Sequence, residues 1–230
     1  MEKGKKDITL ISLGGSLINS SKGIEDKFLK NLRALILRHV RQGKRFIFVT
    51  GGGVVCREYM EAAKRVAKSK NEDLDWIGIY MTRVNASLVR TMFGPYAHPR
   101  IVENPTAKID FKEKILVGGG WMPGASSDID AVLLAKKFSA RTIINLSNIK
   151  YVYDKDPKKY KDAKPFKHIP WAEFRKLVGS SWKSGMHAPF DPIASREAEK
   201  AGLKVVVANG DLKNLDKILS GKDFKGTVIG

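Results

Sequence analysis

The sequence predicts an α/β protein, a three-layer α/β/α sandwich with a mainly parallel central sheet. Two observations support this fold class. Short apolar, β-branched runs alternate with helical patterns along the 230 residues, and glycine-rich turns directly follow three of those runs. Alternation of this kind is typical of a parallel sheet with helices on both faces. The sequence contains no internal repeat, low-complexity tract or linker, so we expect residues 1–230 to form a single domain.

The predicted elements follow from the spacing of apolar residues. Strands are expected at the short β-branched runs, which are 8–13, 45–50, 115–117, 141–146, 204–208 and 226–229. Helices are expected where apolar residues recur every three or four positions, at about 25–41, 54–68, 71–92, 127–137, 172–178, 193–201 and 212–219. Prolines place irregular loops at 94–108 and 151–165.

Two details of the helices are also predicted. Asn71 or Asp73 is expected to cap the long helix that reaches Met92, because both side chains accept hydrogen bonds from free N–H groups. In the helix at 54–68 the apolar residues predict a buried face, made of Val55, Tyr59, Ala62, Ala63 and Val66. Cys56, on the same helix, is expected to be a small core residue.

Composition excludes several classes of protein. No apolar stretch approaches the ~20 residues that a membrane-spanning helix requires, and the apolar run at 8–13 is too short for a signal peptide. The single cysteine excludes an internal disulfide and fits a reducing cytoplasm. The formal net charge is +18, but the basic residues are dispersed, which favours attraction of small polyanionic substrates over a nucleic-acid partner.

Three glycine-rich turns are the most informative feature of the sequence. They are 14–16, 51–53 and 118–128, and each directly follows a predicted strand. In a parallel sheet such turns gather at one edge, and glycine lets a phosphate approach the N–H groups without interference from a Cβ atom. A single turn of this kind serves only to reverse the chain in many α/β proteins. Three together predict a site for several phosphates, and hence a kinase.

Charged residues near these turns are candidates for binding or catalysis. Arg57 lies one turn into the helix after the second glycine turn, where it either holds a phosphate or is solvated. Arg83 lies on a largely apolar helix face and needs an anionic partner, for which we favour a ligand phosphate over an internal carboxylate. Asp128 begins a helix, where a carboxylate either caps N–H groups or orients cations and the water bound to Mg²⁺. Asp75, near the start of another helix, is on spacing alone equally well a capping or surface residue.

Other chemistries lack their motifs. The histidines are scattered without metal-ligand spacing, so we expect no metal site made by the protein alone. No turn matches the Gly-Lys-Ser/Thr pattern of P-loop enzymes, and neither a nucleophile elbow nor a dinucleotide fingerprint is present. These absences argue against a P-loop enzyme, a hydrolase and a dehydrogenase.

An ordered set of segments carries a family resemblance. The segments are Ser12-Leu13-Gly14-Gly15-Ser16, Val49-Thr50-Gly51-Gly52-Gly53 with Arg57, Thr82-Arg83-Val84-Asn85-Ala86, Ser126-Ser127-Asp128 and 148–157. This set resembles the amino acid kinase superfamily, and within it the uridylate (UMP) kinases of archaeal and bacterial type. The similarity spans almost the whole chain, including 191–194 and 226–229. It implies the amino acid kinase fold, with an acceptor-binding half at about 1–125 and an ATP-binding half at about 126–230.

The resemblance implies a cytoplasmic enzyme that transfers the γ-phosphoryl group of ATP to UMP with Mg²⁺, and that forms a homo-oligomer, commonly a hexamer. The implied ATP-binding residues are Gly14, Gly15, Gly53, Arg57, Ser147, Tyr153 and Asp156. The implied UMP-binding residues are Gly52, Asp75, Arg83, Trp121, Met122, Pro123, Gly124, Ala125, Ser126 and Ser127. The implied catalytic residues are Asp128, Arg57 and Gly15.

Two departures from the family pattern leave alternatives open. Ser12 stands where many relatives carry a lysine, and the candidates to replace that cation are Lys150, Lys158 and Lys159. Trp121-Met122 replaces smaller or polar residues, which suggests a kinase for another acceptor, such as isopentenyl phosphate or an amino acid. A non-catalytic nucleotide-binding protein is a further alternative, suggested by Ser12 and the net charge of +18.

Overall fold

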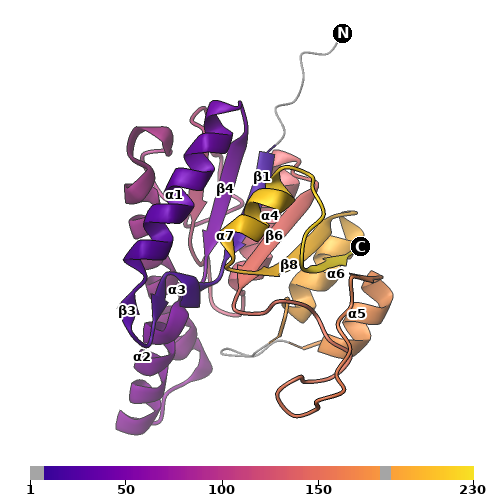
Figure 1. Ribbon diagram of the computed structural model, residues 1–230. Coiled ribbons are helices and arrows are strands. Elements are labelled where there is room, and N and C mark those ends of the chain that lie inside the picture. The colour runs from indigo at the N-terminus through magenta and orange to yellow at the C-terminus, as the bar shows by residue number, and fades with distance from the viewer. Residues whose placement is uncertain (1–7, 182–187) are drawn as a thin grey trace.

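A seven-stranded sheet forms the middle layer of the structure (Figure 1), a computed structural model that describes residues 8–181 and 188–230. Its strands are β1 (Ile8–Leu13), β4 (Arg45–Thr50), β5 (Ile115–Gly118), β6 (Thr142–Ser147), β7 (His168–Ile169), β8 (Lys204–Asn209) and β9 (Thr227–Ile229). Their order is β5-β4-β1-β6-β8-β9-β7, and every neighbouring pair is parallel except β8 and β9. A separate two-stranded hairpin consists of β2 (Asn19–Ser20) and β3 (Gly23–Ile24).

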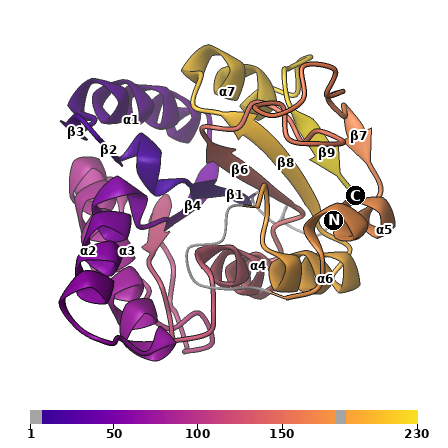
Figure 2. The same ribbon diagram turned by 90° about the horizontal axis from the view of Figure 1, so that it is seen from below.

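Helices cover both faces of this sheet, which confirms the predicted fold class. They are α1 (Asp26–Arg41), α2 (Gly53–Val66), α3 (Asn71–Phe93), α4 (Ser127–Phe138), α5 (Trp171–Val178), α6 (Pro192–Lys200) and α7 (Leu212–Leu219). Figure 2 shows α1 and α7 on one face and α4 and α6 on the other. Short 3₁₀ helices lie at Gly15–Leu17 and Gly94–Tyr96.

Alternating side chains of the strands build a hydrophobic core on each face. In β4, Phe46 and Phe48 pack in the core beneath α1, whereas Ile47 and Val49 pack in the core beneath α4. All four are fully buried, because successive side chains of a strand point to opposite faces and both faces are covered. This double burial explains why the strand segments read as continuous apolar runs.

Most predicted elements are confirmed to within one or two residues, and the differences have physical causes. The strands β2, β3 and β7 were not predicted, since each has only two residues and gives no periodic signal. The N-cap of α3 is Lys70, so the prediction of Asn71 or Asp73 as its cap was wrong. Asp73 lies inside the first turn, where its carboxylate accepts a hydrogen bond from the Lys70 N–H at 3.3 Å.

The predicted buried face of α2 was wrong for two of its five residues, whereas Val55, Ala62 and Ala63 are half-buried. Tyr59 is 61% exposed and Val66 is 85% exposed, whereas Cys56 and Met60 are buried. The two buried residues pack with Leu74 of α3. α2 packs on α3 and on the hairpin and does not lie across the sheet, so it buries only a narrow stripe of side chains. The apolar spacing was interpreted as that of a helix covering the sheet, and it therefore predicted the wrong buried residues.

The topology brings the carboxyl ends of β1, β4, β5 and β6 to one edge of the sheet. This is the lower edge in Figure 1, where α2 and α3 extend below the sheet on one side and the loop at 148–167 lies on the other. All three glycine-rich turns follow strands at this edge. In open α/β sheets ligands bind at such an edge. None of the described helices combines the length and apolar composition that a membrane span requires.

Candidate active site

The first two glycine turns touch each other through their backbones. Leu13 of β1 pairs with Thr50 of β4, so the chain enters both turns at the same level of the sheet. A Cβ atom at Gly15 would overlap the backbone nitrogen of Gly53 and would lie 2.5 Å from the Gly51 carbonyl oxygen. Gly53 itself has a φ of +82°, a conformation that side chains disfavour. Glycine is therefore required at 15 for this close approach and at 53 for the backbone conformation.

A pair of buried asparagines holds the second turn in place. Asn85 of α3 donates from Nδ2 to the carbonyl oxygens of Gly51 at 2.7 Å and Gly52 at 3.1 Å. Its Oδ1 accepts from Asn19 Nδ2 at 2.9 Å. Asn19 Oδ1 also accepts from the Val55 N–H in the first turn of α2 at 3.3 Å, and among the described residues no other side chain binds an N–H group of that turn. The carbonyl groups of the turn thus face the asparagines, while the N-terminus of α2 keeps N–H groups for an anion.

The third turn continues into a loop, residues 119–126, that we call the acceptor loop. Thr82 of α3 accepts from the Gly120 N–H at 2.6 Å, and Asp75 of α3 accepts from the Gly124 N–H at 2.9 Å. From the other side, Asp130 of α4 accepts from the Trp121 N–H at 3.3 Å. The acceptor loop is therefore fixed between α3 and α4.

A cavity of about 260 Å³ lies between the second turn, α3 and the end of the acceptor loop. It brings together many of the predicted site residues, namely Gly52, Gly53, Arg57, Asp75, Ala125, Ser126, Ser127 and Asp128. Arg57 is exposed and forms no ion pair with any residue that the structure describes. One carboxylate oxygen of Asp75 is buried without a hydrogen-bond partner. The cavity thus offers a cation and an acceptor to a ligand.

Only part of the third turn, which is expected to wrap the acceptor, lines this cavity. Residues 121–124 do not line the cavity, and Met122 is 44% exposed. The apolar wall comes instead from residues that the sequence did not point to as site residues, Cys56, Met60 and Ile79. Cys56 has the small buried side chain that was predicted, and it faces this cavity because Gly52 leaves room beside it.

The residues predicted for ATP are partly brought together. Gly14 donates to the Leu146 carbonyl at 2.7 Å and lies against the backbone of Ser147. Tyr153 and Asp156 lie in the loop at 148–167, where Tyr153 bridges to Pro165 and the Asp156 carboxylate accepts from the Lys158 N–H at 2.9 Å. None of these side chains lines the cavity. The structure shows a contact within the protein for each of these four residues, and their roles in ATP binding stay predictions.

Two acidic residues meet at the wall of the cavity. Asp128 accepts from the Ser12 hydroxyl at 3.3 Å and from the Asp191 N–H at 3.0 Å. Burial, with a smaller contribution from the nearby Asp191 carboxylate, raises the pKa of Asp128 to about 7 despite these hydrogen bonds. No Lys or Arg in the described residues forms an ion pair with either acid, so none of the candidate lysines is placed there. Asp128 is not the N-cap of α4, which is Ser126.

Asp191 is a site residue that sequence reasoning did not assign. It is the N-cap of α6, with Oδ1 accepting from the Ala194 N–H at 2.6 Å. Its Oδ2 is buried without a hydrogen-bond partner, and the residue lines the cavity. The sequence Asp191-Pro192 indicates the start of a helix, but it does not indicate that Asp191 belongs to a ligand site.

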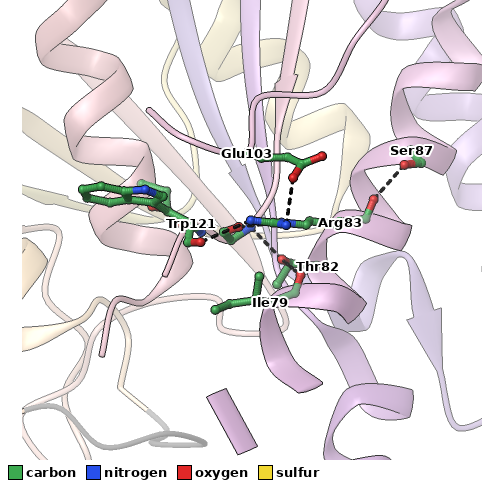
Figure 3. A network of polar contacts seen from close by, with 8 residues as sticks. Ile79, Thr82, Arg83, Ser87, Glu103 and Trp121 are labelled. Atoms are coloured by element: carbon green, nitrogen blue, oxygen red, sulfur yellow. Dashed lines mark hydrogen bonds and ion pairs between the residues drawn. The ribbon is translucent and has the colours of Figure 1, made fainter. Parts of the chain in front are cut away.

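The structure gives Arg83 an internal carboxylate, the alternative that we had disfavoured. Its Nη1 pairs with Glu103 Oε2 at 2.8 Å (Figure 3). Its Nε and Nη2 donate to the carbonyl oxygens of Gly120 and Trp121. Arg83 therefore holds the acceptor loop, and it does not line the cavity. Glu103 lies within the predicted irregular loop at 94–108, so sequence spacing could not identify it as the partner.

Asp130 makes stability depend on pH. Burial raises its pKa from 3.8 to about 7, and one of its oxygens has no hydrogen-bond partner. The folded state thus retains a proton that the unfolded chain releases, so the free energy of unfolding falls as pH rises from about 4 to 7.

We expect Asp130→Asn to raise the melting temperature more at pH 8 than at pH 5. Asp110→Asn, which removes an exposed carboxylate, is the matched control. Equal shifts of melting temperature at both pH values would contradict this account of Asp130.

Comparisons of the sequence and of the fold with known proteins identify the family. The model of the amino acid kinase family matches residues 7–209. The chain is 37% identical over 224 residues to a uridylate kinase of Thermoplasma volcanium, covering 96% of each chain. It is 31% identical over 226 residues to one of Methanobrevibacter smithii, covering 96% of this chain and 98% of the relative. The crystal structure of a uridylate kinase from Archaeoglobus fulgidus matches with a TM-score of 0.80 at 27% identity, over 96% of this chain and 99% of that chain. The chain therefore belongs to the amino acid kinase family.

Proposed function

We propose that this protein is a uridylate kinase that transfers the γ-phosphoryl group of ATP to UMP, giving UDP and ADP. The observation that carries this proposal is the cavity beside the touching glycine turns, with Arg57 and Asp75 on its wall. Phosphoryl transfer needs two polyanions held in line and positive partners for the charge that develops. The near full-length similarity to uridylate kinases, at 37% and 31% identity, supports UMP as the acceptor.

In this proposal UMP occupies the cavity. The N–H groups of Gly53 and Val54 at the start of α2 and the Arg57 guanidinium bind its phosphate, which moves Gly53 and Arg57 from the ATP site that the resemblance implies to the UMP site. The unpaired oxygen of Asp75 accepts from a hydroxyl group of the nucleotide. ATP lies on the other side of the first turn, near Gly14, Ser147, Tyr153 and Asp156. Residues 1–125 then form the acceptor half and residues 126–230 the ATP half. ATP and UMP are cytoplasmic metabolites, which agrees with the expected location.

Mg²⁺ fits the acidic wall of the cavity. Asp191 presents a buried oxygen without a hydrogen-bond partner among the described residues, and such an oxygen is a ligand that Mg²⁺ prefers. Asp128, beside it, would accept hydrogen bonds from water bound to the ion. Bound together with the substrate phosphates, Mg²⁺ would neutralise part of their charge. The protein residues themselves orient the two nucleotides and exclude bulk water.

The acceptor is tested by an ADP-release assay with UMP, CMP, isopentenyl phosphate, glutamate and aspartate. We expect UMP to be the preferred acceptor. Arg57→Ala, purified in the same way, should turn over about 10²–10³-fold more slowly, which excludes a contaminating kinase. Preference for isopentenyl phosphate or an amino acid would overturn the acceptor. Nucleotide binding without turnover of any acceptor would instead favour a non-catalytic protein, for which the uncompensated Asp128 is the motivating observation.

A homo-oligomer is also part of the proposal. Trp76, Tyr80 and Val84 recur every four residues along α3, and all three are exposed. The first turn of α3 carries Glu72 and Asp73, and its last turn carries Arg90. Two copies of this helix in antiparallel contact would therefore pair opposite charges at both ends and bury an apolar stripe between them. A hexamer needs this contact and at least one other.

Light scattering coupled to size-exclusion chromatography tests the contact. We expect Tyr80→Glu to reduce the mass of the assembly, because it places a charge inside the apolar stripe. Tyr160→Glu is the matched control, since Tyr160 is about equally exposed, at 52% against 59%, but lies in the loop at 148–167. A monomeric wild-type protein, or an unchanged mass for Tyr80→Glu, would contradict the proposed contact.

A further inference from the structure

Arg83 uses three separate nitrogens on three different acceptors (Figure 3). Nη1 pairs with Glu103 at 2.8 Å, Nε donates to the Gly120 carbonyl at 3.0 Å, and Nη2 donates to the Trp121 carbonyl at 3.2 Å. The side chain is 20% exposed. A largely buried guanidinium with charge-assisted hydrogen bonds in three directions is held in a single conformation.

Thr82, the residue before Arg83, binds the same loop residue, Gly120, but through the N–H group of that glycine and not through its carbonyl group. Its hydroxyl accepts from the Gly120 N–H and donates to the Ile79 carbonyl, each at 2.6 Å. Both backbone groups of Gly120 are thus bound by two consecutive residues of α3. The preceding Gly119 packs so closely on Arg83 that an added Cβ would lie 3.0 Å from its Cα.

Glu103 holds the outer side of the guanidinium. It follows Val102, whose carbonyl oxygen accepts from the Gly119 N–H at 3.0 Å. The Glu103 segment therefore runs beside the root of the acceptor loop. Because the Glu103 carboxylate is 55% exposed, its ion pair contributes less than the two carbonyl hydrogen bonds that Arg83 makes on its inner side.

The acceptor loop is consequently fixed at both ends. Thr82 and Arg83 bind it at Gly120, and Asp75 binds it at Gly124. Directly after Gly124, Ala125 and the following serines line the cavity. Thr82 and Asp75 line the cavity too, whereas Arg83 acts on the loop from outside it.

We propose that Arg83 is a positioning residue that sets the affinity for the nucleoside monophosphate through the acceptor loop, without touching the nucleotide. This inference rests on the proposed function, since it assigns the cavity to UMP. Arg83 binds the loop through the protein's own carbonyl groups, so it stabilises the loop conformation that lines the cavity. Losing its two carbonyl hydrogen bonds costs affinity for UMP, while the ATP side of the site keeps its geometry.

Steady-state kinetics of Arg83→Met and Arg83→Lys test the proposal. For Arg83→Met we expect the KM for UMP to rise roughly tenfold, with kcat at saturating UMP and the KM for ATP nearly unchanged. Arg83→Lys keeps a cation for Glu103 but cannot reach both carbonyl groups, so the rise should be intermediate. Glu103→Gln is the matched control. It keeps the inner hydrogen bonds of Arg83, and its KM for UMP should stay within about threefold of wild type.

Hydrogen exchange of the nucleotide-free protein provides a readout that does not need activity. The Gly120 and Trp121 amides should exchange roughly tenfold faster in both Arg83 variants than in wild type or Glu103→Gln. A fall in kcat with an unchanged KM for UMP would overturn the proposal, because it would place Arg83 at the transferred phosphoryl group. Unchanged exchange at 120–121 would overturn it as well. A wild-type protein inactive with every acceptor rejects the proposed function, and the exchange experiment then still decides whether Arg83 holds the loop.

Discussion

The backbone contact between the first two glycine turns is the constraint on which the site depends. β1 and β4 are adjacent and parallel, so their following turns leave the sheet side by side, and only glycine at 15 and 51 lets the two chains approach this closely. The contact brings the start of α2 next to the first turn. Two phosphate-bearing ligands bound on either side of it would face each other over a short distance, which is what direct phosphoryl transfer requires.

The helix α3 is the frame that keeps this arrangement in place. Asn85 holds the second turn through two carbonyl groups, and Thr82 and Arg83 hold the root of the acceptor loop. Three residues of one short motif thus fix two of the three turns relative to each other. The buried polar groups of the motif are hydrogen-bonded to backbone, so removing any of them would leave a buried group without its partner.

The sequence was sufficient for the parts of the fold that depend on local patterns. The strands are buried on both faces, so β4 reads as an unbroken apolar run, and the glycine turns follow directly from such runs. It was insufficient where the outcome depends on which elements meet in space. α2 packs on α3 rather than on the sheet, which exposes Tyr59 and buries Met60. The partner of Arg83 lies twenty residues away in an irregular loop, and Asp191 lines the cavity only because α6 packs beside α4.

The most direct measurement is the affinity of a bisubstrate analogue, adenosine and uridine joined 5′ to 5′ through a phosphate chain, measured by isothermal titration calorimetry. If the touching turns place two nucleotides head to head, the analogue should bind one per chain and at least tenfold more tightly than ATP or UMP alone. Gly15→Ala, which forces the turns apart, should lose this gain. An analogue that binds wild type no more tightly than the better single nucleotide would contradict the account.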